Sequence, residues 1–359
     1  MVREYLQYVV DHKASDLHMK AGGPPYMRVN GRLAKTHFPV MTASDCERTA
    51  MELMNDDMAR TFKQKGEADF AFSEAGMGRF RINVYRQRGS VALACRRVLP
   101  GSPSFETLGL PPAVRGLAEK EHRGLILVTG PTSSGKTTTT AAMINHVNAN
   151  RSCHILTIED PIEILHPDRQ AIVNQREVGQ DTQDFAIALR AAMRQDPDVI
   201  FVGEIRDEET VKAALQAAET GHLVISTLHT TDVPETVNRM IDFFPPHQQK
   251  QIRVSLAGSL KGVVSQRLVP RKDGKGQVPA VEVLVMNGRV RDLILNSEQT
   301  HLLHDLIAES SFYGMQTFDQ ALLDLYRSGF VTLEDAVRSS TNPHDFQIAL
   351  RQEGLTPVA

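Results

Sequence analysis

The sequence predicts a mixed α/β protein with an α+β first part, whose sheet is mostly antiparallel, and a second part built on a parallel sheet. Three observations lead to this prediction. Short strand-like segments separated by turns occupy much of the first third of the chain. From about residue 113, apolar runs alternate with helical patterns, as is typical of a parallel sheet covered on both faces. The first of these runs, residues 125–129, leads through a glycine-rich turn into a helical pattern over residues 138–147.

The first part begins with a helical pattern and continues mainly as strands. Asn30-Gly31 lies between two extended segments and predicts a hairpin, because this pair suits the positive φ angles of a type I′ turn. The expected elements are a helix over residues 2–13, a strand over 16–19, hairpin strands over 26–29 and 32–33, a helix over 44–63, and strands over 68–73, 79–86 and 91–98. We therefore expect a first domain over residues 1–99.

Proline and glycine mark the junction between the two parts. They cluster at Leu99–Ser104 and at Leu110-Pro111-Pro112, so residues 100–112 are expected to be a linker. The second domain is expected over residues 113–359. Its predicted elements are strands over 125–129, 154–158, 199–202, 223–227 and 281–285, then helices over 290–296, 301–310, 318–327 and 333–339. The last helices predict a C-terminal helical region over about 285–359.

Composition, charge and cysteine spacing weigh against several classes of protein. With 40 basic and 43 acidic residues the net charge is −3, and no basic stripe with interleaved aromatics is evident, so we expect no stable nucleic-acid binding. The three cysteines form no C-x-x-C pair, which argues against a thiolate zinc site and favours a reducing cytoplasm. No window approaches the roughly 18 apolar residues of a membrane span, so membrane association is expected to be peripheral, through a partner only.

Residues 130–137 fit the phosphate-loop pattern G-x-x-x-x-G-K-[ST] at every fixed position. The two glycines allow backbone amides to point inward around phosphates. Lys136 would add a positive charge near the β and γ phosphates, and the Thr137 hydroxyl would ligate Mg²⁺. The expected ATP-binding residues are Gly130, Pro131, Thr132, Ser133, Ser134, Gly135, Lys136, Thr137 and Thr138. A chance glycine-rich turn is the alternative interpretation.

Two further strands end in carboxylates. Glu159 and Glu163 lie just beyond the strand over 154–158, where they could hold Mg²⁺ through water or orient the attacking water, or simply form a solvated acidic turn. Glu204 follows the strand over 199–202 and is the first choice for polarising the nucleophilic water or binding Mg²⁺. Arg206 and Asp207 follow Glu204 closely and are equally consistent with a surface ion pair and with a functional role.

Histidines and arginines supply the remaining candidates. His222 and His229 flank the strand over 223–227. His229 is predicted to sense the γ-phosphate, whereas His222 is consistent with a purely structural role. Six arginines recur on adjacent predicted strands of the first part: Arg79, Arg81, Arg86, Arg88, Arg96 and Arg97. They form either a solvated face of the sheet or, for one or two of them, arginine fingers that reach a nucleotide held by the other domain.

These elements, in this order, resemble the type II/IV secretion ATPase family, in particular its type IV pilus retraction (twitching motility) ATPases. The matching segments are Ala14–His18, Arg79–Asn83, the phosphate loop, Thr157–Glu163, Leu189–Asp207, Gly221–Thr231 and Gly314–Asp319. The resemblance covers nearly the whole chain.

The resemblance implies a PAS-like N-terminal domain, a RecA-like P-loop ATPase domain and a ring hexamer with nucleotide at subunit interfaces. Arg81 and Arg96 or Arg97 would then act in trans. It also implies a cytoplasmic ATP hydrolase that uses Mg²⁺ at the inner-membrane base of the pilus machine. There it would act on an inner-membrane platform protein, with a paralogous retraction ATPase as a further candidate partner.

Related activities are the alternatives. Pilus assembly and type II secretion ATPases usually carry a long extra N-terminal domain, whereas the first family motif here begins at residue 14. Many also carry a four-cysteine loop after a Gln-Arg-Leu stretch, whereas residues 271–276 after Gln266-Arg267-Leu268 contain no cysteine. Both differences favour retraction. Residues 289–294 depart from the family's Ala-Ile-Arg-Asn-Leu-Ile pattern, which leaves principal and accessory motors as alternatives. A nucleic-acid motor and a non-hydrolysing scaffold are the remaining interpretations.

Overall fold

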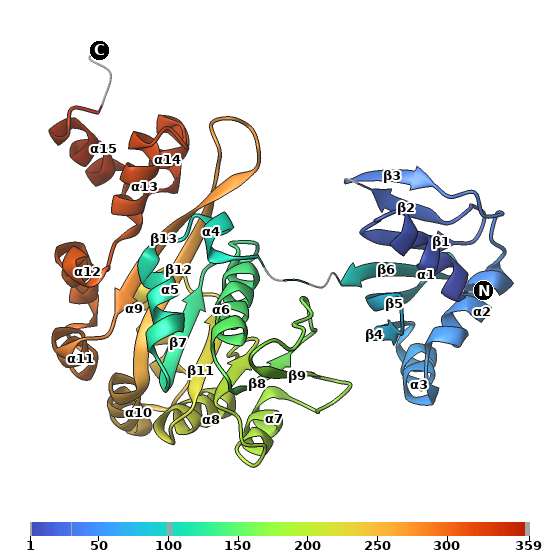
Figure 1. The fold of residues 1–359 in the computed structure, drawn as a ribbon, viewed down its shortest axis with the longest axis horizontal. Helices are drawn as coiled ribbons and strands as arrows, with labels where there is room; N and C mark the ends of the chain where they lie inside the picture. The colour runs from blue at the N-terminus through green and yellow to red at the C-terminus, as the bar shows by residue number, and fades with distance from the viewer. Residues whose placement is uncertain (1, 30, 99–100, 102, 356–359) are drawn as a thin grey trace. The chain divides into compact units, whose positions relative to one another are not determined.

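The structure is a computed structural model that describes residues 2–29, 31–98, 101 and 103–355. It divides into two compact units, one of residues Met1–Gly101 with Glu163–Leu165 and one of residues Ser102–Ile162 with His166–Ala359. Figure 1 shows the helices and strands of each unit. Asn30 of the predicted hairpin turn, residues 99, 100 and 102 of the predicted junction, and the end of the chain from residue 356 lie outside the described residues.

The first unit is a six-stranded antiparallel sheet in the order β3-β2-β1-β6-β5-β4. Its helices and strands are α1 (Val2–Asp11), β1 (Asp16–Lys20), β2 (Tyr26–Val29), β3 (Arg32–Lys35), α2 (Ala43–Leu53), α3 (Asp56–Lys65), β4 (Glu67–Glu74), β5 (Gly78–Gln87) and β6 (Ser90–Val98). The apolar sides of the three helices and one face of the sheet form a single core, which includes Leu6, Ala50, Phe62, Phe80 and Leu93. The alternate residues of the strands form the other, polar face.

One predicted helix of this unit is wrong. The expected helix over residues 44–63 is two helices, α2 and α3, because the chain leaves the helical conformation at Met54, whose ψ is 139°. Asn55 then starts α3, since its side chain accepts a hydrogen bond from the backbone N–H of Met58. Asparagine is a strong N-cap residue, and this local signal separates the two helices although the amphipathic pattern continues across them.

The second unit is a seven-stranded sheet in the order β13-β12-β7-β11-β10-β8-β9. All neighbouring strands are parallel except the β12–β13 pair. The elements up to β13 are α4 (Phe105–Leu108), α5 (Pro112–Lys120), β7 (Gly124–Thr129), α6 (Lys136–Asn150), β8 (His154–Glu159), β9 (Ile172–Glu177), α7 (Phe185–Ala192), β10 (Val199–Val202), α8 (Glu208–Glu219), β11 (Leu223–Leu228), α9 (Val233–Asp242), α10 (Pro246–Ser259), β12 (Leu260–Pro270) and β13 (Gln277–Val285).

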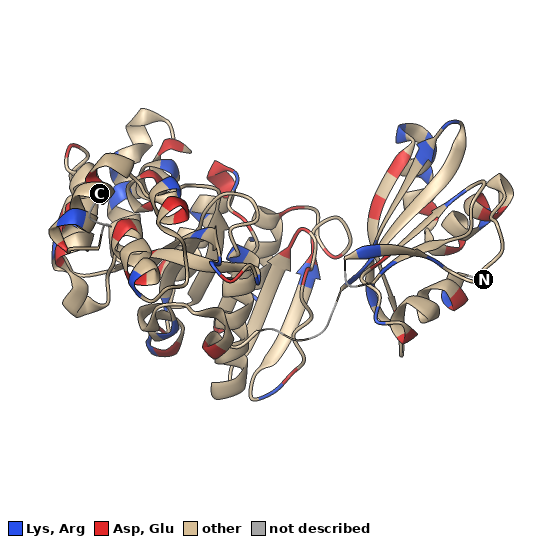
Figure 2. Ribbon diagram, turned by 90° about the horizontal axis from the view of Figure 1, so that it is seen from above, with Lys and Arg blue, Asp and Glu red and all other residues tan. Residues whose placement is uncertain are grey.

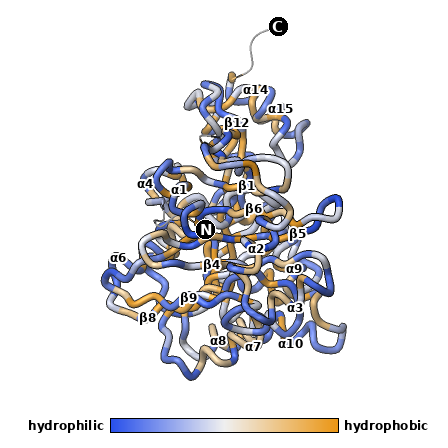
Figure 3. Tube along the Cα trace, turned by 90° about the vertical axis from the view of Figure 1, so that its right-hand side faces the viewer, coloured by the Kyte–Doolittle hydropathy of each residue, from blue (hydrophilic) through white to orange (hydrophobic). Residues whose placement is uncertain are grey.

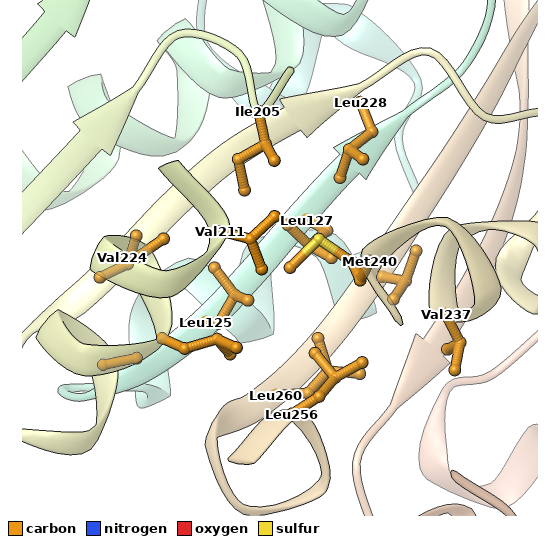
Figure 4. Packing of buried hydrophobic residues seen from close by; sticks show 14 of the residues in the cluster. Leu125, Leu127, Ile205, Val211, Val224, Leu228, Val237, Met240, Leu256 and Leu260 are labelled. Carbon is orange, nitrogen blue, oxygen red and sulfur yellow. The ribbon is translucent and has the colours of Figure 1, made fainter. Parts of the chain in front are cut away.

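Helices cover both faces of this sheet, and strand β7 shows how. Leu125 and Leu127 point to one face, where they join a core with residues of α8, α9 and α10. Figure 4 shows Val211 and Met240 from these helices beside Leu127. The alternate residues Ile126 and Val128 join the second core, with residues of α5 and α6. Because the strand is buried on both faces, its sequence is a continuous apolar run rather than an alternating one.

The sequence analysis missed strands β9 and β12. Four of the six residues of β9 are polar, from Asn174 to Glu177, because β9 lies at the edge of the sheet. Strand β12 starts directly after α10 without a turn, and its middle contains the polar residues Ser265, Gln266 and Arg267. The tube in Figure 3 colours each residue by its hydropathy, and hydrophobic and hydrophilic residues follow one another in short stretches along much of the chain.

The expected strand over residues 281–285 belongs to the main sheet, as part of β13, and the helical region follows it. Its elements are α11 (Gly288–Leu295), η1 (Thr300–Leu302), α12 (Leu303–Glu309), η2 (Ser311–Tyr313), α13 (Phe318–Arg327), α14 (Leu333–Ser339) and α15 (Pro343–Gln352). Helix α15 was not predicted. Basic and acidic residues are interspersed on the helices and strands of both units (Figure 2).

Glu282 is a carboxyl group in the interior of the second unit. It lies on β13 opposite Ser265 of β12, and only 1% of it is exposed. Its Oε1 accepts a hydrogen bond of 2.7 Å from the backbone N–H of Val233, at the start of α9. Burial raises the pKa of Glu282 to about 7, although that hydrogen bond opposes the rise. The folded protein therefore keeps a proton that the unfolded chain loses at lower pH.

We expect Glu282→Gln to remove a pH dependence of stability. The pKa of this group rises from 4.5 to about 7 on folding, so the free energy of unfolding falls as pH rises through this window. At pH 8 the variant should be more stable than wild type by up to roughly 3 kcal/mol, and at pH 5 by much less. Urea unfolding of the full chain at both pH values measures the difference. Glu298→Gln, at an exposed position, is the matched control; a Glu282→Gln protein no more stable than wild type at pH 8 would contradict the assignment.

Candidate functional site

The predicted phosphate loop connects the end of β7, at Thr129, to the start of α6, at Lys136. Gly130 and Gly135 have φ angles of 146° and 92°, which L side chains rarely adopt. A Cβ atom at Gly130 would also lie 2.5 Å from the backbone oxygen of Gln266 and 2.5 Å from Ser134 Oγ. Residue 130 therefore has to be glycine for the loop to pack against β12.

Lys136 is buried at the start of α6 and its ammonium group turns back over the loop. Its Nζ donates hydrogen bonds of 2.7 Å to the Gly130 oxygen and 2.9 Å to the Pro131 oxygen. The positive charge is thus held beside the loop backbone. Gly135 is the N-cap of α6 and has no side chain that could satisfy the first amides of the helix. The N-terminal end of a helix, with its amides and the positive end of its dipole, favours an anion at this position.

The other predicted loop residues differ in exposure. Ser134 is buried, and its Oγ has no hydrogen-bond partner among the described residues. The exposed members are Pro131, Thr132, Ser133, Thr137 and Thr138. The hydroxyl groups of Thr137 and Thr138 are therefore accessible at the first turn of α6.

Glu204 and His229 come together beyond the ends of neighbouring strands. β10 ends at Val202 and β11 at Leu228, and the two strands are parallel and adjacent, so their carboxyl ends meet at one edge of the sheet. Nε2 of His229 lies 3.4 Å from Oε1 of Glu204. The loop after β7 leaves the same edge, since β7 is the other neighbour of β11.

Arg206 holds the other oxygen of Glu204. Its Nε and Nη2 are both 2.9 Å from Glu204 Oε2, and its Nη1 is 3.4 Å from Asp160 Oδ2. Arg206 therefore connects the segments that follow β10 and β8. It forms ion pairs, and one of its partners is the candidate catalytic carboxylate Glu204. Asp160 follows Glu159 directly in the turn after β8. Its pairing with Arg206 depends on the neighbouring positions of β8 and β10 and has no local sequence signal.

Glu159 and Glu163 have different surroundings. Glu159 is buried at the end of β8, where its Oε1 accepts hydrogen bonds from Thr157 Oγ1 at 2.6 Å and from Gln175 Nε2 of β9 at 3.0 Å. Glu163 is exposed and falls in the first unit. These contacts give Glu159 a role in joining β8 to β9.

No three His, Cys, Asp or Glu side chains form a metal-binding group within the described part of the chain. Mg²⁺ at a nucleotide needs no such group, because phosphate oxygens and water supply most of its six ligands. One exposed hydroxyl group, that of Thr137, and one carboxylate, that of Glu204, fit this kind of coordination.

The candidate arginines of the first unit lie on two different faces of its sheet. Arg81 on β5 and Arg96 on β6 are direct cross-strand partners, so they share a face. Arg97 pairs with Phe80, whose side chain is in the core, and alternation therefore puts Arg97 on the opposite face from Arg96. Arg97 therefore does not share a face with Arg81 and Arg96, and which of the three acts in trans stays a prediction.

Carboxylates hold both arginines of the shared face. Nε of Arg96 lies 2.9 Å from Asp16 Oδ1, and Nη2 of Arg81 lies 2.6 Å from Asp69 Oδ2. Burial raises the pKa of Asp16, but hydrogen bonds from Arg96 and Ser15 outweigh burial and leave this pKa lowered. The face thus presents two oriented guanidinium groups that would otherwise repel each other.

A G-x-x-x-x-G-K-[ST] loop between a buried strand and a helix, in a parallel sheet covered by helices, defines the class of phosphate-loop nucleotide-binding proteins. Within that class, the family model described as type II/IV secretion system protein matches residues 1–338. The chain belongs to this family.

Individual relatives match over nearly their whole length. The type IV pilus ATPase PilU of Pseudomonas aeruginosa is 41% identical over 346 residues, which are 96% of this chain and 90% of that protein. The type IV pilus retraction ATPase PilT of the same organism is 40% identical over 345 residues, 96% of this chain and 99% of that protein. The crystal structure of the pilus retraction motor PilT with bound ADP has a TM-score of 0.87 at 46% identity, covering 96% of this chain and 98% of that one. The predicted α/β fold class and family are confirmed.

Proposed function

We propose that this protein is an ATP-hydrolysing motor that drives type IV pilus retraction. The observation that supports this most is the joint presence of a complete phosphate loop and the Glu204–His229 pair on adjacent strand ends. The chain that contains them resembles retraction ATPases over 96% of its length. Bound ADP in the related PilT structure supports a nucleotide as the ligand of the loop here.

Different groups of the site have different proposed roles in hydrolysis. Backbone amides of the loop and Lys136 bind the phosphates, and the Thr137 hydroxyl with Glu204 would hold Mg²⁺. The metal would neutralise charge on the β and γ phosphates. Glu204 orients and polarises the attacking water, and its contacts with Arg206 and His229 fix its carboxylate in direction before substrate binds. His229, on the same carboxylate, is placed to respond when the γ-phosphate leaves.

Arg81 and Arg96 are proposed to complete the site of a neighbouring subunit in a ring hexamer. Both guanidinium groups are held on one polar face by carboxylates, so little side-chain entropy would be lost when they meet a phosphate. This arrangement makes hydrolysis depend on assembly, as a motor with sites at subunit interfaces requires.

The proposed location is the cytoplasmic side of the inner membrane, at the base of the pilus machine. Within the described ranges, no helix combines the length and the apolar character that crossing a bilayer requires. Contact with the membrane is therefore proposed to run through an inner-membrane platform protein. A paralogous retraction ATPase is the second proposed partner, because relatives named PilT and PilU are equally similar to this chain.

Deletion of the gene in its host tests the function. We expect surface pili to accumulate while twitching motility is lost, and re-expression of the wild-type protein to restore movement. Absence of surface pili would instead identify an assembly motor. Phosphate release by the purified protein should require ATP and not DNA. Hydrolysis that depends on a nucleic acid would indicate a nucleic-acid motor, and no hydrolysis in any assembly state would indicate a scaffold.

A further inference from the structure

Four buried hydroxyl groups form a connected cluster beneath the candidate site, and we call it the hydroxyl cluster. It consists of Thr129, Thr230, Thr236 and Ser265, each no more than 3% exposed. The Oγ atoms of Thr129 and Ser265 are 2.8 Å apart, those of Thr129 and Thr236 are 3.4 Å apart, and those of Thr230 and Thr236 are 2.6 Å apart. Buried hydroxyl groups need partners, and these are partners of one another.

The members come from segments that the mechanism uses. Thr129 is the residue before Gly130 of the phosphate loop, and Thr230 is the residue after His229. Thr236 lies in the first turn of α9 and contacts both of them, whereas Ser265 is on β12. The cluster thus joins the base of the phosphate loop to the loop that carries His229.

Thr236 is the central member, and its hydrogen-bonding capacity is filled. Its one hydroxyl proton faces two acceptors, the Asp232 carbonyl oxygen at 2.6 Å and, at a longer distance of 3.4 Å, Oγ1 of Thr129. The short contact with Thr230 must then be donated by Thr230. Removing the Thr236 hydroxyl would leave the buried Thr230 hydroxyl without this partner, whereas the Asp232 carbonyl would still accept from the Thr236 backbone N–H. The loop around His229 would then lose this anchor.

We propose that Thr236 is a positioning residue for ATP hydrolysis, which fixes the His229 loop against the base of the phosphate loop. The inference rests on the proposed ATPase function. The Thr236 hydroxyl makes the two loops move together. The state of the γ-phosphate at one loop and the position of His229 at the other are then coupled through packed, hydrogen-bonded groups.

The test compares three variants of the full chain by steady-state phosphate release. Thr236→Val removes the hydroxyl and keeps the shape, so we expect kcat to fall about ten-fold with the KM for ATP within about two-fold of wild type. Thr236→Ser restores the hydroxyl and should recover most of kcat. Thr210→Val is the matched control, because Thr210 is a threonine near the start of α8 that is 1% exposed and whose Oγ1 has no partner within the described residues. It should hydrolyse ATP as wild type does.

A double-mutant cycle separates positioning from a general structural effect. In a His229→Gln background, Thr236→Val should have little further effect on kcat, because the group that it positions is already gone. An equal fold-loss in both backgrounds, or a Thr236→Val protein indistinguishable from Thr210→Val, would overturn the proposal. Should Thr236→Val fail to fold, Thr230→Val breaks the same contact from the other side and must show the same dependence on His229. A wild-type ring without hydrolysis would instead overturn the proposed function, and this inference with it.

Discussion

Lys136→Ala is expected to abolish ATP hydrolysis, with a loss of more than about a hundred-fold in kcat/KM. The Lys136 ammonium group is buried and lies within 2.9 Å of two carbonyl oxygens of the loop, so it is already positioned where phosphates would enter. The backbone amides of the loop cannot supply this positive charge. In the alanine variant, the negative charge that develops in the transition state therefore lacks a cation beside it. Phosphate release measured over a range of ATP concentrations, from well below KM upward, gives kcat/KM for both proteins.

Lys212→Ala is the matched control for this prediction. Lys212 is exposed on α8, and its loss should leave hydrolysis and stability within error of wild type. Far-UV circular dichroism of both variants verifies the fold. A folded Lys136→Ala protein that turns over ATP within two-fold of wild type would show that residues 130–137 are only a structural turn.

Glu204→Gln should lower kcat by about a hundred-fold while ATP binding is retained. Glutamine keeps the size of the side chain and an oxygen that can accept from Arg206, but it cannot take a proton from water or neutralise a metal. The fold should survive the change, because Arg206 is half-exposed and keeps its second partner, Asp160. Binding of a fluorescent ATP analogue and phosphate release, measured on the same sample, separate the two effects.

The control for Glu204→Gln is Glu209→Gln, a few residues along the chain. Glu209 is exposed and pairs with Arg190 at 3.2 Å on the surface, an interaction worth well below about 1 kcal/mol. Glu209→Gln should therefore hydrolyse ATP normally. If Glu204→Gln does so as well, the attacking water is activated elsewhere, and Glu159 becomes the next carboxylate to replace.

Local sequence patterns predicted the parallel sheet and its strand ends well, because those strands are buried on both faces and read as unbroken apolar runs. Residues 125–129, for example, match β7 to within one residue. The break between α2 and α3 was missed because the apolar spacing continues across Asn55 and conceals its capping signal. Edge strand β9 was missed for the opposite reason, since a strand at the edge of a sheet does not have to be apolar.

The sequence by itself determined the phosphate loop, the family and where the buried parallel strands end, because glycines, Lys136 and apolar runs act within a few residues of one another. The tertiary structure decided which distant groups meet. Arg206 joins Glu204 to Asp160, and Thr236 joins Thr129 to Thr230, only because parallel strands β7, β11, β10 and β8 lie side by side. The order of strands in a parallel sheet depends on how the crossover helices between strands pack on the two faces of the sheet, and no local sequence pattern encodes it.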